Sequence, residues 1–332
     1  NVFPGYQKVT DAAVREKFEK AWGAPMPDKV GLMIPEMFDK ANSGELKAMY
    51  ILGENPVLTD PNANHIKSGL DKLEFLVVQE LFLTETAEFA DVVLPSASFA
   101  ETDGTFTNTE RRVQRVRKAI EPLPGKANWQ TIMAMSSKAG YAMNYNSAEE
   151  IFNEMASLTP SYAGISYARI NAQGLQWPCP TADHPGAKFL HGASFSRGKG
   201  LFQGIDHVPP AEMPSKDYPL LLSTGRVLYH YNVTTPYSAG IQSIWNEEHA
   251  EVNPDDASKL GVVTGDQVKV TSRRGDVTAK VEVTDRVPPG MVWMSFHHTA
   301  SPTNVLTSDA VDPITKTGEY KVCAVKMERI NA

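Results

Sequence analysis

The sequence is poor in cysteine, and this scarcity excludes several kinds of site. Only two of its 332 residues are cysteines, Cys179 and Cys323, and they lie far apart in the chain. A zinc or iron–sulfur site held by cysteines needs several of them at short spacing, so we expect none within this chain. A disulfide framework is equally unexpected, which suits a reducing compartment. We therefore expect a cytoplasmic protein, with the periplasm as the alternative.

The sequence also has no long hydrophobic run and no surplus of positive charge. No stretch of about 18 apolar residues occurs, which is the length that a membrane-spanning helix needs. The chain has 32 Lys and Arg against 39 Asp and Glu, a formal net charge of −7. This balance argues against a nucleic-acid binder, and an anionic ligand must be held by local Arg or His side chains. The first residue is not Met, which suggests a processed piece or a fragment.

Short apolar runs followed by polar turns recur in the first hundred residues. Residues 49–52, 75–78 and 92–94 are such runs, and residues 62–70 between the first two are compatible with a helix. This pattern is typical of parallel strands in a sheet covered on both faces. Ligands of such sheets bind beyond the carboxyl ends of the strands. We therefore expect one crevice to be lined by the residues that end these strands, namely Gly53, Glu54, Asn55, Gln79, Glu80, Pro95 and Ser96.

Two interpretations of these strand-ending residues remain open. A glycine lets the backbone approach a phosphate, and a Glu or Asn side chain can accept from a ribose hydroxyl or a base amine. The set could therefore form part of a nucleotide site. The alternative is that the same residues only terminate strands, and spacing alone favours this simpler interpretation.

The middle of the chain connects two different kinds of pattern. Residues 101–108 form a turn-rich loop, and the basic stretch 111–118 alternates with Val113 and Val116. That alternation favours a strand with a solvated face over a nucleic-acid site, because the chain as a whole is acidic. Residues 129–139 are predicted to be a helix. Residues 160–214 contain several Pro and Gly and are predicted to be an irregular connector.

The last third of the chain is rich in strand patterns. Strands are predicted at residues 220–223, 267–271, 277–284 and 291–296. One helix is expected at residues 254–260, with Asn253 as its N-cap and Gly261 just past its end. Many short strands with one helix predict a closed barrel. The expected fold is α/β plus all-β: part of a doubly wound parallel-sheet domain followed by a C-terminal β-barrel.

Two groups of polar residues stand out in this last third. Arg226 follows a strand and could grip a phosphate with both arms of its guanidinium, with His230 and Asn232 adding hydrogen-bond donors. A surface hairpin is the alternative for this segment. His297 and His298 end another strand, where successive side chains point to opposite faces. At most one of the two therefore faces a site, and they are not expected to form a metal pair.

The motifs become specific when they are taken in order. The chain resembles the molybdopterin oxidoreductase family at residues 50–56 (YILGENP), 90–95 (ADVVLP), 101–114 (ETDGTFTNTERRVQ), 253–261, 272–275 and 313–321. Within that family it resembles the formate dehydrogenase catalytic subunit at residues 1–6 (NVFPGY) and 176–180 (QWPCP). The resemblance covers essentially the whole chain.

The resemblance implies a cofactor and a reaction. Members of the family hold molybdenum or tungsten between two molybdopterin guanine dinucleotides, and most carry an iron–sulfur cluster. In formate dehydrogenases a Cys or selenocysteine binds the metal, and a His and an Arg assist the oxidation of formate to carbon dioxide. All of these residues, including those that hold the [4Fe-4S] cluster, belong to the N-terminal half of the usual subunit. No catalytic or metal-binding residue is therefore assigned here.

The chain thus resembles the C-terminal half of such an enzyme, which implies partners. We expect the N-terminal half of the same subunit, with its cluster and metal ligand, together with electron-transfer subunits. Two alternatives remain: half of a nitrate reductase of the same family, or a non-catalytic scaffold module of a respiratory complex. The expected parts are an α/β pterin-dinucleotide-binding domain over residues 1–98, an interface segment over 99–190 and a β-barrel over 191–332. Residues 101–114 match the part that packs on the cluster-bearing domain.

The resemblance also assigns cofactor-binding positions. Those around the guanosine and diphosphate of one dinucleotide are Gly53, Glu54, Asn55, Thr59, Gln79 and Ser96. Asn128 stands where relatives often have an Asp that pairs with guanine, and an amide offers only one acceptor oxygen there. Those at a strand end near diphosphate and pterin are Arg226, His230 and Asn232. Those on the pterin side of the barrel are Phe296, His297, Asn304, Tyr320 and Lys321.

Overall fold

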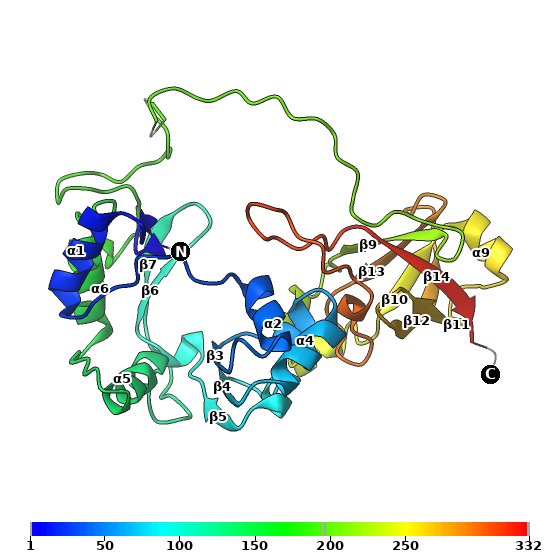
Figure 1. Ribbon diagram of the computed structural model, residues 1–332, viewed down its shortest axis with the longest axis horizontal. Coiled ribbons are helices and arrows are strands. Elements are labelled where there is room, and N and C mark those ends of the chain that lie inside the picture. The colour runs from blue at the N-terminus through cyan, green and yellow to red at the C-terminus, as the bar shows by residue number, and fades with distance from the viewer. Residues whose placement is uncertain (1, 193, 196, 331–332) are drawn as a thin grey trace. The chain divides into compact units, whose positions relative to one another are not determined.

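The chain folds into two compact units, each made from two separate stretches of sequence. The computed structural model describes residues 2–192, 194–195 and 197–330, so Asn1, where the resemblance begins, lies outside it. The first unit combines the residues up to Leu32 with Pro95–Ile205. The second combines Met33–Leu94 with the residues from Asp206 onward (Figure 1). The division into residues 1–98, 99–190 and 191–332 concerns functional parts and remains a prediction.

The first stretch of the second unit is an α/β layer. Its elements are α2 (Ile34–Asn42), β3 (Ala48–Leu52), α3 (Pro56–Thr59), α4 (Ala63–Asp71), β4 (Phe75–Glu80), the 3₁₀ turn η1 (Ala87–Phe89) and β5 (Val92–Pro95). The strands form a sheet in the order β3-β4-β5, and β3 runs parallel to β4. Phe38 of α2 and Ile66 of α4 pack on Leu76 and Val78 of β4. The predicted parallel sheet is thereby confirmed.

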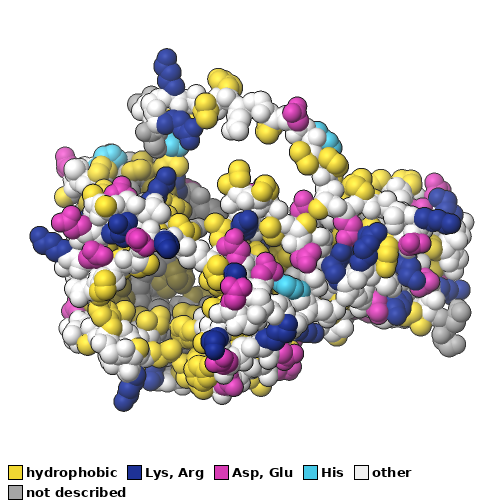
Figure 2. Space-filling model, in the orientation of Figure 1, with side chains coloured by type: hydrophobic (Ala, Val, Ile, Leu, Met, Phe, Trp, Pro, Cys, Tyr) yellow, Lys and Arg dark blue, Asp and Glu magenta, His cyan; other side chains and the backbone are white. Residues whose placement is uncertain are grey.

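The opposite face of this sheet is open in the described structure. Tyr50 and Leu52 alternate with partly buried neighbours along β3 and are 40% and 38% exposed. Phe75, which pairs with Ala48 on the same face, is also exposed. Figure 2 shows hydrophobic side chains at the surface in the region of β4 and β5. A parallel sheet is normally covered on both faces, so this face has the character of an interior surface.

The second stretch of the same unit is a closed six-stranded barrel. Its strands are β9 (Leu220–Gly225), β10 (His249–Val252), β11 (Gln267–Thr271), β12 (Asp276–Val283), β13 (Met291–Ser295) and β14 (Cys323–Arg329), paired in the order β10-β12-β11-β14-β9-β13. Pairing of β13 with β10 closes the ring. Inward residues such as Leu222, Val252 and Met294 are fully buried and fill it. The predicted barrel is confirmed.

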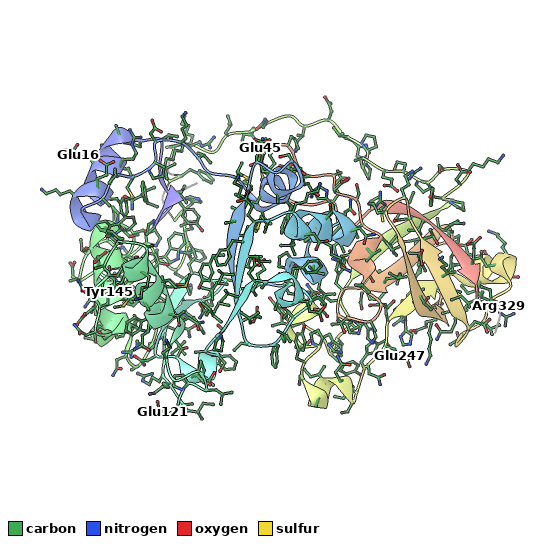
Figure 3. The ribbon with its side chains drawn as sticks, turned by 60° about the horizontal axis from the view of Figure 1, so that its bottom comes forward. Glu16, Glu45, Glu121, Tyr145, Glu247 and Arg329 are labelled. Atoms are coloured by element: carbon green, nitrogen blue, oxygen red, sulfur yellow. The ribbon has the colours of Figure 1, made fainter. Side chains whose placement is uncertain are left out.

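Shorter elements connect the barrel strands. They are η3 (Asn232–Thr234), α8 (Ala239–Gln242), α9 (Pro254–Leu260) and η4 (Thr303–Val305). Helix α9 has the predicted bounds because its ends are encoded locally. The Asn253 side chain accepts from the backbone N–H of Asp255, and Gly261 ends the helix with a φ of 66°. Figure 3 labels Glu247, just before β10, and Arg329, the last residue of β14.

The first unit is a small mixed domain. Its elements are β1 (Val2–Phe3), β2 (Gln7–Lys8), α1 (Ala12–Trp22), η2 (Phe99–Glu101), β6 (Gly104–Thr107), β7 (Arg112–Val116), α5 (Asn128–Lys138), α6 (Ala148–Leu158), α7 (Tyr167–Ile170) and β8 (Leu175–Gln176). The basic stretch forms β7, as predicted. Arg111 donates to the carbonyls of Ala187 and Lys188, and Arg117 donates to that of Asn171. These arginines therefore serve the fold.

Two expectations from composition can be compared with the structure. Cys179 and Cys323 are free thiols and both are buried. Within the described ranges, no helix is both long and apolar enough to cross a membrane. The predicted connector of residues 160–214 is largely irregular but contains α7 and β8.

Candidate functional site

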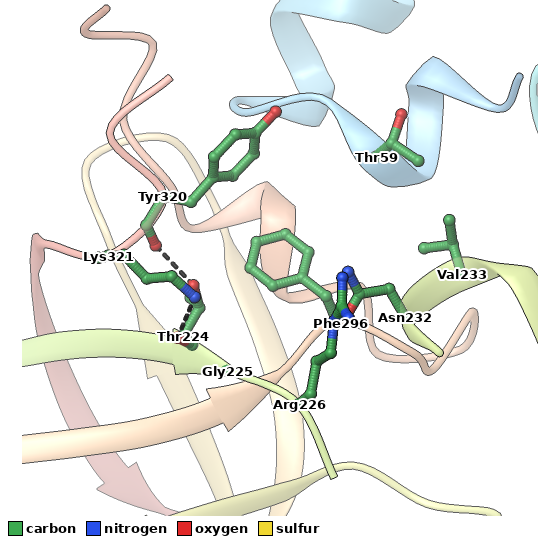
Figure 4. A pocket seen from close by; sticks show the side chains of 9 residues that line it. All are labelled: Thr59, Thr224, Gly225, Arg226, Asn232, Val233, Phe296, Tyr320 and Lys321. Atoms are coloured by element: carbon green, nitrogen blue, oxygen red, sulfur yellow. Dashed lines mark hydrogen bonds between the residues drawn. The ribbon is translucent and has the colours of Figure 1, made fainter. Parts of the chain in front are cut away.

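A cavity of about 330 Å³ lies where the α/β layer and the barrel of the second unit meet. Figure 4 shows its lining, which is Thr59, Thr224, Gly225, Arg226, Asn232, Val233, Phe296, Tyr320 and Lys321. Six of these nine are residues that the sequence predicts to bind a cofactor: Thr59, Arg226, Asn232, Phe296, Tyr320 and Lys321. They come from four separate parts of the chain. The fold therefore assembles a site that is dispersed in sequence.

The end of β9 forms one wall of the cavity. Thr224 Oγ1 donates to the carbonyl of Tyr320 over 2.7 Å, and Lys321 Nζ donates to the carbonyl of Thr224 over 2.6 Å. These bonds attach the segment before β14 to the end of β9. Gly225 is required beside them, because a Cβ at this position would lie 2.5 Å from the ring of Trp293. Thr224 and Gly225 were not predicted as cofactor-binding residues. Their position at a strand end, just before Arg226, could have indicated that they line the site.

Arg226 provides one of the two exposed cations of the cavity, the other being Lys321. The Nε of Arg226 donates to Asn232 Oδ1 over 3.0 Å, and its guanidinium lies 4.5 Å from the centre of the Tyr231 ring. These two contacts hold the side chain in one direction. Among the described residues, no hydrogen bond to protein occupies its two Nη groups, which leaves them for a ligand. A guanidinium with two such groups suits a phosphate.

Another part of the cavity wall carries an aromatic pair, and nearby Asp60 is not itself a lining residue. The rings of Phe296 and Tyr320 meet edge to face with their centres 5.7 Å apart. Burial, with the charges of Asp60 and Glu54, raises the pKa of Tyr320 to about 12, so its hydroxyl remains protonated. Burial also raises the pKa of Asp60 to about 6, against a hydrogen bond from Thr59 that lowers it. The wall thus offers a hydroxyl and apolar ring surface.

Asn304 lies behind the cavity and joins the two parts of the unit. Its side chain is fully buried, and Nδ2 donates to the carbonyls of Val57 over 2.9 Å and Asp60 over 2.8 Å. Both donors are therefore used on α3 and the residue after it. Asn304 positions Thr59 at the cavity instead of lining it.

The strand-ending residues of the α/β layer are largely engaged with each other. Gly53 has a φ of 66° and donates its N–H to the carbonyl of Gln79, which is fully buried. Asn55 Oδ1 accepts from the N–H and the hydroxyl of Thr86, over 3.2 and 2.6 Å. Glu54 is exposed. The Asn55 amide thus holds the start of η1 in place, and the crevice expected at these strand ends stays a prediction.

Ser96 and Asn128 belong to the other compact unit. Asn128 Oδ1 accepts from the N–H of Ala97 over 2.7 Å, and Nδ2 donates to the carbonyl of Ala97 over 3.3 Å. The Asn128 side chain thus makes two hydrogen bonds to the backbone of Ala97, the residue after Ser96. An ionised Asp could accept the first of these bonds but could not donate the second. The second bond therefore explains why an amide suits this position.

The two predicted histidines of the barrel lie together. The rings of His230 and His297 stack with centres 4.2 Å apart, and both are almost fully buried. His230 Nε2 donates to the carbonyl of Trp245 over 2.7 Å, and Nδ1 contacts the hydroxyl of Thr235. The ring of His298 is turned 80° from that of His297. Within the described ranges, no group of three His, Cys, Asp or Glu residues is arranged to hold a metal.

Comparison with known proteins gives this geometry a family. Residues 17–138 match the model named Molybdopterin oxidoreductase, and residues 220–324 match the Molydopterin dinucleotide binding domain. The chain belongs to the molybdopterin oxidoreductase family. The F420-dependent formate dehydrogenase subunit alpha of Methanocaldococcus jannaschii is 48% identical over 99% of this chain and 50% of its own length. The subunit alpha of F420-dependent formate dehydrogenase 2 of Methanococcus maripaludis is 47% identical over the same shares.

A solved structure supports the fold of this family member. Acetylene hydratase from Pelobacter acetylenicus has a TM-score of 0.71 and 17% identity, over 99% of this chain and 51% of that one. At this identity the likeness concerns the fold alone. The chain spans about half the length of the curated relatives it matches.

The residues that line the cavity lie within the regions matched by the two family models. All except Thr59 lie within the matched residues 220–324, and Thr59 lies within residues 17–138. A pterin dinucleotide combines a planar heterocycle with an anionic diphosphate. The free Nη groups of Arg226, the Lys321 ammonium and the aromatic wall match these two parts in charge and shape. The residues present therefore fit the family's cofactor.

Proposed function

We propose that this chain is the cofactor-binding, C-terminal half of a molybdenum- or tungsten-dependent formate dehydrogenase catalytic subunit. The observation that carries the proposal is the cationic and aromatic cavity inside the matched dinucleotide-binding region. The names of the two relatives support formate as the substrate. When bound, the bis-molybdopterin guanine dinucleotide would supply the metal that accepts two electrons from formate.

The residues of this chain bind and orient that cofactor in our proposal. Arg226 and Lys321 neutralise the diphosphate, and Phe296 and Tyr320 contact the planar ring system. Asn304 holds α3 so that Thr59 reaches the same cavity. Among the other predicted positions, the resemblance assigns Gly53, Glu54, Asn55, Gln79 and Ser96 to guanosine and diphosphate contacts and Asn128 to a guanine contact.

The missing half supplies what this chain lacks in our proposal. It would carry the [4Fe-4S] cluster and the Cys or selenocysteine ligand, and pass electrons to further subunits. The open face of the β3-β4-β5 sheet supports such a partner, because Tyr50, Leu52 and Phe75 expose apolar surface there. Exposed apolar patches of this kind mark surfaces that another part of the protein covers.

Nucleotide analysis tests the cofactor. Protein purified together with its partner polypeptide is denatured in acid, and the released guanine nucleotide and pterin are quantified. Arg226→Ala is expected to lower the content about tenfold or more, because one charge-assisted pair with a phosphate is lost. Arg329→Ala is the matched control, since this arginine pairs with Asp266 at the end of β14. Absence of guanine nucleotide from the unaltered protein, or an unchanged content in Arg226→Ala, would refute the proposal.

Activity assays test the reaction separately. Formate with an oxidised dye is compared with nitrate and a reduced dye, and F420 is offered as a further acceptor of the electrons from formate. Our proposal predicts formate oxidation that falls about tenfold or more in Arg226→Ala, in line with the loss of cofactor. Activity with nitrate only would assign the chain to a nitrate reductase. Formate oxidation that is unchanged in Arg226→Ala would make this chain a scaffold.

A further inference from the structure

A buried carboxylate stands behind the histidine pair of the barrel. Glu248, just before β10, is 3% exposed. It accepts from the backbone N–H of Ser295 over 2.8 Å and from the Ser295 hydroxyl over 2.9 and 3.0 Å. Ser295 Oγ also contacts Nδ1 of His297. Burying a carboxylate is unfavourable unless it is hydrogen-bonded, and Ser295 provides the bonds here. A chain of three side chains thus links Glu248 to His297.

The direction of these hydrogen bonds follows from the number of protons. A serine hydroxyl has one proton, and an ionised carboxylate can only accept. Ser295 therefore donates its proton to Glu248, and its oxygen accepts from His297. Nδ1 of His297 must then carry the proton, which leaves Nε2 of a neutral ring as a bare acceptor. Which nitrogen of a histidine is protonated is generally set by the partner of the other nitrogen.

The second nitrogen of His297 has no partner among the described residues. Nε2 makes no hydrogen bond to any of them, and water cannot supply one because the His297 side chain is only 1% exposed. A buried polar atom without a partner is unfavourable by about 1–3 kcal/mol and calls for an explanation. Phe296, the preceding residue, lines the cavity, whereas His297 is almost fully buried and is not one of the lining residues. An acceptor held ready next to a ligand site explains both observations.

We propose that Glu248 is a positioning residue that acts through Ser295 to keep Nε2 of His297 unprotonated, as the acceptor for an N–H group of the bound pterin. The identity of this donor rests on the proposed function, whereas the control of the tautomer is a property of this chain alone. Glu248 immediately precedes β10 and Ser295 is the last residue of β13, so no local sequence motif indicates the arrangement.

Ionisation of Glu248 makes this arrangement sensitive to pH. Burial raises the pKa of Glu248 to about 7, against the Ser295 hydrogen bonds that lower it. Burial lowers the pKa of His297 to about 4, helped by neighbouring His230, His298 and His249, so the ring is neutral at pH 7. Glu247 is the other nearby carboxylate and pairs with Lys280. Above pH 7, Glu248 is ionised and accepts. Below pH 7, the protonated carboxyl of Glu248 donates to Ser295 Oγ, and the Ser295 hydroxyl then donates to Nδ1 of His297. Nδ1 is now the acceptor, so the proton of the neutral ring is on Nε2.

The tautomer can be measured directly in the full chain. Nitrogen NMR with ¹⁵N-labelled histidine distinguishes bare from protonated ring nitrogens, and the His297 signals are identified by their loss in His297→Gln. At pH 8 we expect a bare Nε2. Glu248→Gln keeps the shape, but its amide donates to Ser295, so the protonated nitrogen should change to Nε2. Glu247→Gln, on the adjacent carboxylate labelled in Figure 3, should leave the signals unchanged.

A second variant removes the link itself. In Ser295→Ala, the further change Glu248→Gln should have no effect on the His297 signals, because the connection is already broken. A protonated Nε2 in the unaltered chain at pH 8 would overturn the proposal, as would identical His297 signals in the unaltered chain and Glu248→Gln.

The cofactor measurement separates the two proposals. If the unaltered protein contains no guanine nucleotide, the proposed function fails while the tautomer result stands. If nucleotide is present and Glu248→Gln leaves the tautomer unchanged, only the positioning role fails. If both hold, Glu248→Gln should lose bound pterin while Glu247→Gln retains it.

Discussion

The junction between the α/β layer and the barrel should depend on one buried amide. Asn304→Ala removes two hydrogen bonds from Asn304 Nδ2, to the carbonyls of Val57 and Asp60. Each carbonyl left without a donor is unfavourable by about 1–3 kcal/mol, so the local free energy of opening should fall by about 2–6 kcal/mol. Asn64→Ala is the matched control, since Asn64 donates a single bond at the surface to the carbonyl of Arg274. That loss should amount to about 0.5 kcal/mol.

Hydrogen exchange with mass spectrometry measures this difference in the segment concerned. Amides of α3 and α4 should exchange about 30- to 20,000-fold faster in Asn304→Ala, and only about twofold faster in Asn64→Ala. Helix α1 lies in the other unit and serves as an internal reference. Equal acceleration in the two variants would refute the reasoning, because it would show that burial of the Asn304 amide has no influence on the junction.

Three further changes test other parts of the structure. Burial raises the pKa of Glu212, but hydrogen bonds and charge from Arg274, with other contacts, outweigh it, and the net pKa is lowered. The ionised Glu212 therefore stabilises the fold at neutral pH. This stabilisation is lost as the pH falls below the ordinary pKa of Glu. Glu212→Gln should lower the free energy of unfolding by about 2 kcal/mol at pH 7 and much less at pH 3 in urea titrations. Gly164→Ala would place a Cβ 2.0 Å from the carbonyl oxygen of Thr181, so limited proteolysis should cleave the first unit and spare the barrel; equal resistance to cleavage would contradict this. Burial raises the pKa of the Cys323 thiol to about 11, so at pH 8 a maleimide should label it about 100-fold more slowly than a free cysteine.

Elements with local signals were predictable from the sequence. Helix α9 was predicted with its observed bounds because Asn253 and Gly261 encode its two ends. Strand β11 was predicted with its observed bounds, and β12 and β13 to within one residue, because their buried residues alternate along the chain. The resemblance supplied the cofactor-binding positions, six of which the fold brings to one cavity.

Features that depend on distant pairing were not predictable. Strand β8 has only two residues, and it exists because Leu175 and Gln176 pair with β7, which lies some sixty residues earlier. The role of Glu248 depends on Ser295, a strand away in the barrel. Asn304 was assigned to the pterin side of the barrel, whereas its amide is used on α3. In each case the sequence shows the residue type, and only tertiary structure shows its partner.

The interleaved order of the two units has a consequence for synthesis on the ribosome. Residues 33–94 emerge first, but the barrel on which they pack begins only after residue 205, roughly a hundred residues later. At ordinary translation speeds this delay is about 5–20 s. During that time α3 and α4, which contact the barrel connection η4 in the folded unit, have no barrel to pack on. The nascent chain should therefore be a chaperone client in this interval, and slowing translation between residues 95 and 205 should increase its aggregation.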